Sequence, residues 1–186
     1  MEIQKTFIEG VYIIKADVYN DERGFFYESY NEKRYSDIGL NARFVQDNVS
    51  FSKKGTIRGL HYQLNPFSQA KLVHVLRGAV LDVVVDLRED SPTYGKHFSI
   101  ELTRENKLQL FVPRGMAHGF SVLSDEALFS YKCDNTYDKN SERGINVFDP
   151  VLAIDWRVSR EDAVVSDKDL VLPEFELIKN QELLKQ

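Results

Sequence analysis

The stretch Ile57-Arg58-Gly59-Leu60-His61-Tyr62-Gln63 combines strand-forming residues with a guanidinium group and an imidazole. Successive side chains of a β-strand point to opposite faces, so His61 and Gln63 share one face while Leu60 lies on the other. This alternation of polar and apolar faces is typical of a strand that has one side in a core. We therefore predict a strand over residues 57–63 that carries part of a functional site.

The same pattern continues on both sides of this stretch. From Arg43 to Gly144, short apolar and aromatic segments alternate with turn signals, which is typical of an all-β sandwich or barrel. Residues 81–86 alternate strictly, with Asp82 and Asp86 on a second, more polar face. The expected turns fall at residues 53–55, 65–66, 77–78, 90–92, 113–115 and 124–125.

The two ends of the chain contain the predicted helices. Residues 10–14 form a short predicted strand, and a turn at 21–24 leads into an aromatic strand at 25–30. Asn31 is a good N-cap for a short helix that runs to about residue 38. Apolar residues recur at helical spacing near the C-terminus, so we predict a helix over residues 174–185.

Composition excludes several classes of protein. The 186 residues are 42% hydrophobic and 28% charged, which is ordinary for a globular domain. The net charge of −5 provides no general basic field, so we predict no nucleic acid partner. No segment reaches the roughly 18 apolar residues of a membrane span, and the start of the chain lacks a secretory signal. Cys133 is the single cysteine and allows no intrachain disulfide, so we expect a cytoplasmic protein.

His61 and Lys71 are the main candidate catalytic residues. An unperturbed imidazole titrates near pH ~6.5, which suits a general base, although a single histidine on a strand can be purely structural. Lys71 shares a face with Val73 and Val75, where a charge is costly unless it is paired or used in function. The alternative is a lysine that protects an edge strand against aggregation.

Other polar residues could complete the site. Gln46 and Asn48 lie two apart, so they face one way and could bind a hydroxyl-rich ligand, or they could be ordinary strand residues. His118 is flanked by Gly115 and Gly119, which would allow a close approach to the backbone. Tyr131 shares a face with apolar neighbours, so it is either a functional hydroxyl or a core tyrosine.

The histidines do not form an obvious metal site. Metal-binding cupins use a His-x-His pair, a glutamate and a later histidine. In this chain Gln63 replaces the second histidine, and Lys71 stands near the position expected for an acid. His61 and His118 alone fall short of the three or four ligands that a site needs, so we expect no metal. The sequence also lacks a dinucleotide fingerprint, a phosphate-binding loop and a nucleophile elbow.

Several longer motifs follow one another in a fixed order. They begin before the predicted β region and end close to the C-terminus. The motifs are Asp21-Glu-Arg-Gly-Phe-Phe-Tyr-Glu28, Val45-Gln-Asp-Asn-Val-Ser50, Ile57-Arg-Gly-Leu-His-Tyr-Gln63, Val112-Pro-Arg-Gly-Met-Ala-His-Gly-Phe120, Tyr131-Lys-Cys133, Glu142-Arg-Gly144, Asp149-Pro150 and Ser166-Asp-Lys-Asp169.

With these motifs the chain resembles the dTDP-4-dehydrorhamnose 3,5-epimerase family from about Phe7 to Pro173. The resemblance implies a mainly β, cupin-type jelly roll with a few short helices and a C-terminal helix. It implies one epimerase domain over residues 1–186, with a jelly-roll core at about 43–148. It also implies a homodimer that binds a small nucleotide sugar and needs no metal or organic cofactor.

The family's functional residues can be matched position by position. By resemblance His61 is the general base, Asp169 is its partner, Lys71 stabilises an oxyanion and Tyr131 is the general acid. Strict alternation separates Arg58 from His61, so we expect a bulge or strand end near Gly59. The positions that match substrate-binding residues are Arg23, Glu28, Gln46, Asp47, Asn48, Arg58, Lys71, His118, Glu142 and Lys168.

The implied chemistry is consistent with this set of residues. The family's substrate, dTDP-4-dehydro-6-deoxy-D-glucose, has a 4-keto group that acidifies the hydrogens at C3 and C5. Removal of either hydrogen gives an enolate, and a proton returned to the opposite face inverts the carbon. Two alternatives remain open from the sequence: an epimerase that acts only at C3 or only at C5, and a sugar-nucleotide-binding protein without catalytic activity.

Overall fold

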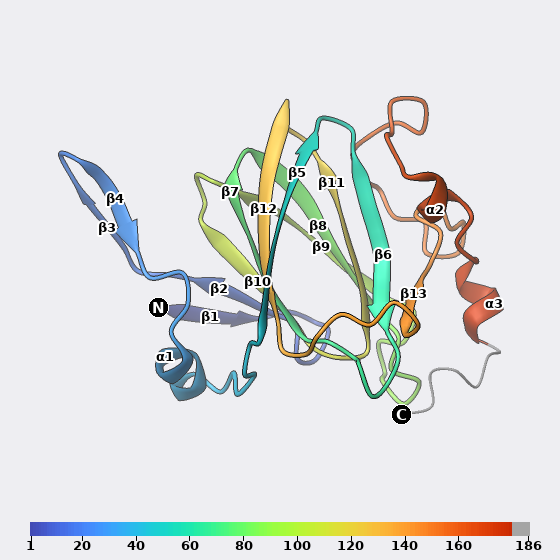
Figure 1. The fold of residues 1–186 in the computed structure, drawn as a ribbon, viewed down its shortest axis with the longest axis horizontal. Helices are drawn as coiled ribbons and strands as arrows, with labels where there is room; N and C mark the ends of the chain where they lie inside the picture. Colours follow the sequence, from blue (N-terminus) through green and yellow to red (C-terminus); the bar gives the residue numbers. More distant parts are fainter. Residues whose placement is uncertain (180–186) are drawn as a thin grey trace.

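Antiparallel strands form the frame of the protein, which the computed structural model describes for residues 1–179 (Figure 1). One sheet has the strand order β1-β2-β10-β7-β12-β5, and the second has the order β13-β6-β11-β8-β9. The two sheets pack face to face, so the predicted mainly β jelly roll is confirmed.

The elements have the following bounds. The strands are β1 (Glu2–Lys5), β2 (Tyr12–Lys15), β3 (Val18–Asp21), β4 (Gly24–Tyr27), β5 (Gln46–Lys53), β6 (Ile57–Gln63), β7 (Lys71–Arg77), β8 (Ala79–Asp86), β9 (His97–Thr103), β10 (Leu108–Val112), β11 (Met116–Val122), β12 (Glu126–Cys133) and β13 (Glu142–Gly144). The helices are α1 (Glu32–Asp37), α2 (Asp167–Leu170) and α3 (Phe175–Lys179).

A hydrophobic core fills the space between the two sheets. Val73 on β7 and Phe129 on β12 pack from the first sheet against Val84 on β8 and Phe120 on β11 from the second. The rings of Phe120 and Phe129 stack with centroids 4.3 Å apart. These residues point inward because alternation along each strand sends every second side chain to the same face.

A second core covers the outer face of the β6–β11–β8 sheet. Leu81 and Val83 of β8 pack there against Trp156 and Phe175 from the C-terminal segment. As a result both faces of β8 are buried, and its more polar face lies inside the jelly roll instead of facing solvent. Each aspartate on that face is therefore expected to have a polar partner.

Most local predictions from the sequence are confirmed. All six expected turns fall between strands or directly after one. Asn31 caps α1, with its side-chain oxygen accepting a hydrogen bond from the backbone N–H of Arg34. The predicted C-terminal helix begins at Phe175, and the rest of it lies outside the described residues. Among the described residues, no helix is long and apolar enough to cross a membrane.

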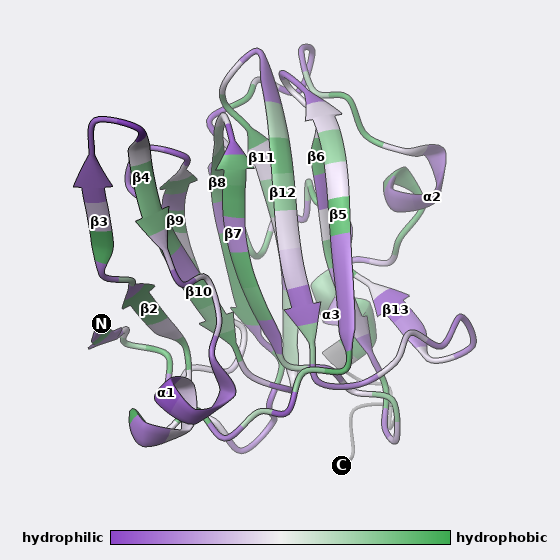
Figure 2. Cartoon of the chain, turned by 60° about the vertical axis from the view of Figure 1, so that its left-hand side comes forward, coloured by the Kyte–Doolittle hydropathy of each residue, from purple (hydrophilic) through white to green (hydrophobic). Residues whose placement is uncertain are grey.

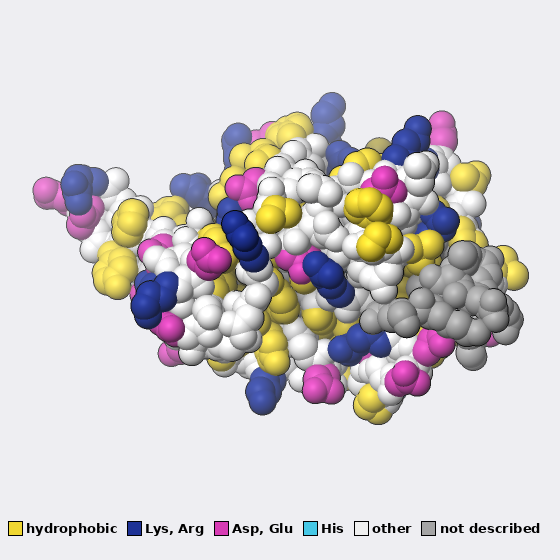
Figure 3. Space-filling view, turned by 60° about the horizontal axis from the view of Figure 1, so that its bottom comes forward, with side chains coloured by type: hydrophobic (Ala, Val, Ile, Leu, Met, Phe, Trp, Pro, Cys, Tyr) yellow, Lys and Arg dark blue, Asp and Glu magenta, His cyan; other side chains and the backbone are white. Residues whose placement is uncertain are grey.

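The predicted aromatic strand at 25–30 is shorter than expected and belongs to a separate hairpin. β4 ends at Tyr27 and pairs only with β3 in a two-stranded sheet. This β3–β4 hairpin projects away from the two main sheets (Figures 1 and 2). Phe26 is 68% exposed and Tyr19 is 62% exposed. Hydrophobic and charged side chains therefore lie together on a projecting arm, which Figure 3 shows on the molecular surface.

Candidate active site

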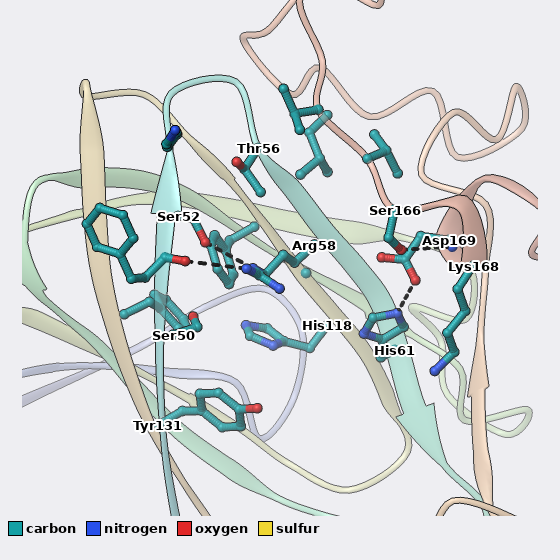
Figure 4. Close-up of a pocket in the computed structure, with 18 of the residues that line it drawn as sticks. Ser50, Ser52, Thr56, Arg58, His61, His118, Tyr131, Ser166, Lys168 and Asp169 are labelled. Carbon is teal, nitrogen blue, oxygen red and sulfur yellow. Dashed lines mark hydrogen bonds and ion pairs between the residues drawn. The ribbon is translucent and has the colours of Figure 1, made fainter.

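A pocket of about 770 Å³ lies between the two sheets, lined by residues of β5, β6, β7, β11 and β12. The pocket is bounded by strands of both sheets and by the segment that leads into α2 (Figure 4). The polar residues that line it are Ser50, Ser52, Lys53, Lys54, Thr56, Arg58, His61, Lys71, His118, Tyr131, Ser166, Lys168 and Asp169.

An irregularity in β6 brings Arg58 and His61 to the same pocket. His61 pairs in register with His118, whereas Arg58 pairs with Phe120, so three steps along β6 match two steps along β11. The extra residue is next to Gly59, whose φ of +136° is accessible to glycine and not to ordinary residues. The predicted bulge near Gly59 is therefore confirmed.

His61 and Asp169 form a hydrogen-bonded pair. The Nε2 atom of His61 lies 2.7 Å from Oδ1 of Asp169, whose side chain is almost completely buried. Burial raises the pKa of Asp169, but the hydrogen bond and charge interaction with His61 and the hydrogen bond from Ser166 outweigh it, so the pKa lies below its usual value. The carboxylate is thus ionised at neutral pH and orients the imidazole of His61.

The chain reaches this arrangement by a long-range contact. Thr56, just before β6, forms an isolated parallel bridge with Val164, which places the following segment beside the pocket. Ser166 then caps α2 by accepting a hydrogen bond from the backbone N–H of Asp169. This cap fixes the first turn of α2 and directs the carboxylate toward His61.

Lys71 and Tyr131 lie on the opposite sheet from His61. The Nζ atom of Lys71 is 5.9 Å from the centroid of the Tyr131 ring, and both side chains line the pocket. Burial lowers the pKa of Lys71 below its usual value, and the nearby Cys133, Asp82 and Glu142 offset this only in part. Burial raises the pKa of the Tyr131 hydroxyl, which keeps it protonated at neutral pH. The Tyr131 hydroxyl lies across the pocket from His61 (Figure 4).

His118 lies beside His61 and has a carboxylate partner of its own. Its Nε2 atom is 3.0 Å from both carboxylate oxygens of Asp82, which is fully buried. Sequence reasoning noted Asp82 only as part of a polar face and did not place it in the site. A carboxylate on a strand with otherwise apolar residues was the available signal, because such a group requires a partner when it is buried.

A network of polar side chains continues outward from Lys168, and its other members, Glu142, Tyr137, Gln46 and Asn48, are not among the residues that line the pocket. Glu142 accepts hydrogen bonds from Lys168 and from the hydroxyl of Tyr137. Burial raises the pKa of Glu142, but the hydrogen bonds from Lys168 and Tyr137 bring it below its usual value. Gln46 accepts a hydrogen bond from the backbone N–H of Tyr137 and donates one to Asn48. Tyr137 was not singled out from the sequence, where it looks like an ordinary loop tyrosine.

The structure does not bring every predicted binding residue to the pocket. Asp47 points to the opposite face of β5 from its neighbours and pairs with Lys132. Arg23 lies in the turn of the β3–β4 hairpin, where its exposed guanidinium pairs with Asp21. Glu28 follows the hairpin and pairs with Arg34. In a single chain these three residues therefore take no part in the pocket.

A metal site is not found in the described part of the chain. No group of three or more histidine, cysteine, aspartate or glutamate side chains within residues 1–179 could hold a metal ion. The two imidazoles in the pocket each face a carboxylate, and a lysine lies nearby. The pocket is thus suited to proton transfer beside a fixed cation.

Known proteins share both the sequence and the fold. A sequence profile for the family described as dTDP-4-dehydrorhamnose 3,5-epimerase matches residues 5–176. A dTDP-4-dehydrorhamnose 3,5-epimerase from Shigella flexneri is 51% identical over 171 residues, covering 91% of this chain and 93% of that protein.

Solved structures give the same result. The crystal structure of dTDP-4-dehydrorhamnose 3,5-epimerase from Elizabethkingia anophelis is 53% identical, with a TM-score of 0.90 and coverage of 95% of this chain and 97% of that one. The dTDP-6-deoxy-D-glucose-3,5-epimerase from Legionella pneumophila, solved with dTDP-4-keto-L-rhamnose, is 49% identical with a TM-score of 0.91, covering 95% of this chain and 94% of that one.

Proposed function

The chain belongs to the dTDP-4-dehydrorhamnose 3,5-epimerase family, and on that premise we propose how its pocket residues perform the reaction. The protein is an enzyme of dTDP-L-rhamnose biosynthesis. It epimerises C3 and C5 of dTDP-4-dehydro-6-deoxy-D-glucose to give dTDP-4-dehydro-L-rhamnose. The 4-keto group of the substrate supplies the electron sink, so the chain's own residues need only move protons and stabilise charge.

His61 is the proposed base. Its pairing with Asp169 supports this role, because the carboxylate holds the ring in place and stabilises the imidazolium form that results from proton abstraction. The partly exposed ring lies at the pocket wall, where a sugar carbon could reach it. Because C3 and C5 both adjoin the ketone, one base can serve both carbons in turn.

Lys71 is the proposed stabiliser of the enolate. Deprotonation at either carbon places negative charge on O4, and a fixed cation inside a dry pocket stabilises such a charge far more than it would in water. Lys71 is half-buried and lines the pocket, so its ammonium group would provide this cation. Among the described residues it forms no ion pair with a carboxylate.

Tyr131 is the proposed acid. Inversion requires a proton on the face opposite the base, and Tyr131 belongs to β12 in the sheet that faces His61. Burial raises the pKa of its hydroxyl, so the group is protonated at neutral pH and able to donate.

Arg58 and Lys168, two cationic residues that line the pocket, form the proposed binding site for the diphosphate of the nucleotide. Arg58 is held in the pocket by a hydrogen bond from its Nε to the Ser52 hydroxyl, which orients the guanidinium. Lys168 lies on the other side of the same opening. Arginine and lysine side chains bind diphosphate oxygens through charge-assisted hydrogen bonds.

A homodimer is the proposed assembly. The β3–β4 hairpin exposes Phe25 and Phe26 and carries Arg23, which resembles a diphosphate-binding residue but lies away from the pocket of its own chain. Exposed aromatic side chains on a projecting arm are suited to bury against a partner. Insertion of the hairpin into a second copy would bring Arg23 to that copy's pocket and cover the aromatic side chains together.

A cytoplasmic location is also proposed. Its support is the lone Cys133, which is buried as a free thiol and forms no disulfide.

The single observation that carries the proposal is the placement of the His61–Asp169 pair and Tyr131 on opposite walls of one pocket. Incorporation of solvent deuterium into the substrate, followed by NMR at C3 and C5, tests it. Label at both carbons is expected. Label at one carbon only would indicate the narrower 3- or 5-epimerase, and label at neither would contradict the proposed chemistry.

The same assay tests whether a metal takes part. Dialysis against a chelator should leave the exchange rate unchanged, because the proposed roles of base, cation and acid all belong to side chains. Loss of exchange that a divalent ion restores would contradict this proposal.

A further inference from the structure

Asp169 lies on a segment that has little regular structure of its own. α2 contains only four residues, and Asp169 is the third of them. The start of the segment is anchored by the bridge between Thr56 and Val164, and Ser166 caps the first turn. Because a single helical turn is not stable alone, the position of the carboxylate also depends on what holds the other end of the segment.

The side chain of Asn146 holds that other end. Its amide nitrogen donates to the carbonyl oxygen of Leu170, the residue after Asp169, at 2.9 Å, and lies 3.5 Å from the carbonyl oxygen of Leu172. Its side-chain oxygen accepts a hydrogen bond from the backbone N–H of Phe148 at 2.9 Å. A carbonyl only accepts and an N–H only donates, so these partners fix the orientation of the amide. The amide thus satisfies the carbonyl of the last helical residue, which the helix itself leaves without a partner.

Asn146 is also joined to the strand that carries His61. β13 pairs antiparallel with β6, and Gly144 lies opposite His61 in register. Ile145 continues the pairing by exchanging two backbone hydrogen bonds with Leu60. Asn146 follows directly, so its side chain connects the strand that holds the proposed base to the helix that holds the partner of that base.

We propose that Asn146 is a positioning residue: by fixing the end of α2, its side-chain amide holds the Asp169 carboxylate against Nε2 of His61. The inference rests on the proposed roles of His61 and Asp169. Their hydrogen bond is 2.7 Å long, and a displacement of about 1 Å would break it. A displacement of that size in a reacting group lowers a rate by up to about a hundred-fold.

The substitution Asn146→Asp removes only the side-chain donor. Aspartate keeps an oxygen that accepts from Phe148, but it places a second acceptor against the carbonyl of Leu170. The backbone hydrogen bond from Asn146 to Pro173 remains, so the segment should stay attached. Asn146→Ala removes the same donor without adding a charge.

Asn106→Asp is the matched control. The amide of Asn106 also donates to a backbone carbonyl, that of Glu101, and its oxygen also accepts from backbone N–H groups. Asn106 lies in the turn between β9 and β10 and does not line the pocket. Thermal unfolding of all the variants shows whether they are folded before any rate is compared.

The first measurement is the ¹H–¹⁵N NMR signal of the His61 ring without substrate, identified by its absence in His61→Ala. An ionised carboxylate only accepts hydrogen bonds, so the ring carries a proton on Nε2 and shares it with Asp169. This hydrogen bond should keep the Nε2–H signal visible in the wild type and in Asn106→Asp. Exchange with water should broaden or remove the signal in both Asn146 variants, as in Asp169→Asn. An unchanged signal in both Asn146 variants would overturn the proposal.

The second measurement is a double-mutant cycle on the rate of deuterium exchange at saturating substrate. Each Asn146 variant should lower the rate by about ten-fold, and Asn106→Asp should not change it. In an Asp169→Asn background the same substitutions should lower the rate by no more than about two-fold, because the group that Asn146 positions has already been changed. Equal factors in the two backgrounds would overturn the proposal, since Asn146 would then act on something other than Asp169.

Two further comparisons separate this role from others. Lys168 is next to Asp169 on α2, so the cycle is repeated in a Lys168→Ala background, where the ten-fold loss should persist. Disappearance of the loss there would show that Asn146 acts through Lys168 and would overturn the proposal. If Asp169→Asn exchanges at the wild-type rate, the proposed role of the His61–Asp169 pair is wrong. If Asp169→Asn is impaired while both Asn146 variants keep the wild-type rate, only the role of Asn146 is wrong.

Discussion

Gly59 and Gly119 lie against each other across β6 and β11, so closely that a Cβ atom on Gly59 would stand 2.6 Å from the Cα of Gly119. No side chain fits between them. The contact occurs where β6 contains its extra residue, and it lets Arg58 and His61 point into one pocket. Two glycines on neighbouring strands thus determine the geometry of the site without contributing a side chain to it.

His61→Ala should abolish deuterium exchange at C3 and C5 while leaving dTDP binding within a few-fold of the wild type. Exchange depends on one base, whereas binding is spread over many groups at the rim. NMR exchange and calorimetric titration with dTDP measure the two effects. His97→Ala, on β9 outside the pocket, is the control and should exchange normally. Near-normal exchange in His61→Ala would contradict the assignment of the base.

Tyr131→Phe should slow inversion of the sugar carbons without stopping the exchange of their hydrogens with solvent. The variant keeps the ring and removes only the hydroxyl, so His61 can still remove and return protons on its own face. Inverted product should fall by about two orders of magnitude or more, while exchange with solvent persists.

Comparison of exchange and product formation in one NMR experiment measures this effect, with Tyr12→Phe on β2 as the control. If exchange and inversion fall together, Tyr131 positions the substrate and is not the acid. If neither falls, it is a core tyrosine.

Arg23→Ala should weaken dTDP binding by about ten-fold or more, the usual scale for one hydrogen bond to a charged group. The reason is the proposed contact with the diphosphate in a partner's pocket, because Arg23 is exposed in its own chain. Lys33→Ala, which removes another exposed ion pair, is the control and should bind normally. Light scattering should give about twice the chain mass of 21.5 kDa. A monomeric mass with unweakened binding in Arg23→Ala would contradict the shared site.

Asp86→Asn should lower the free energy of unfolding at pH 7 by about 2 kcal/mol. Burial raises the pKa of Asp86, but hydrogen bonds from Arg88, Ser91 and Thr93 lower it to about 2, against 3.8 in an unperturbed aspartate. A lowered pKa in the folded state stabilises the protein above the unfolded-state pKa, and this stabilisation is lost as the pH falls toward 2.

Denaturant unfolding at several pH values measures this effect. The difference between wild type and variant should be constant above about pH 5 and should shrink between pH 4 and pH 2. Asp90→Asn, an exposed carboxylate of the same loop, should show no such difference. A gap that stays constant down to pH 2 would contradict the explanation.

The turns and the start of α1 were predictable because neighbouring residues in the sequence determine them. The turns carry glycine, proline, asparagine or aspartate residues, and Asn31 satisfies the first backbone donors of α1. Alternation also predicted which face of β5 each side chain occupies. Gln46 and Asn48 share one face, and Asp47 lies on the other face beside Lys132. The bulge at Gly59 was predictable because strict alternation could not place Arg58 and His61 together.

Features that depend on distant segments were not predictable in the same way. Both faces of β8 are buried because Trp156 and Phe175, more than 60 residues later, cover its outer face. The pairing of Asp82 with His118 joins residues 36 positions apart on neighbouring strands. The motif containing Arg23 indicated a binding residue, but not that its hairpin lies away from the pocket of the same chain.

The projecting β3–β4 hairpin would make each catalytic centre composite, with His61 from one subunit and Arg23 from the other. A substitution at Arg23 in one subunit then impairs the centre that contains the partner's His61. A mixed dimer of one Arg23→Ala chain and one His61→Ala chain then contains one centre with both residues intact and one centre lacking both. Random reassociation of two impaired proteins would restore about a quarter of the centres, a form of complementation that no enzyme with self-contained subunits can show.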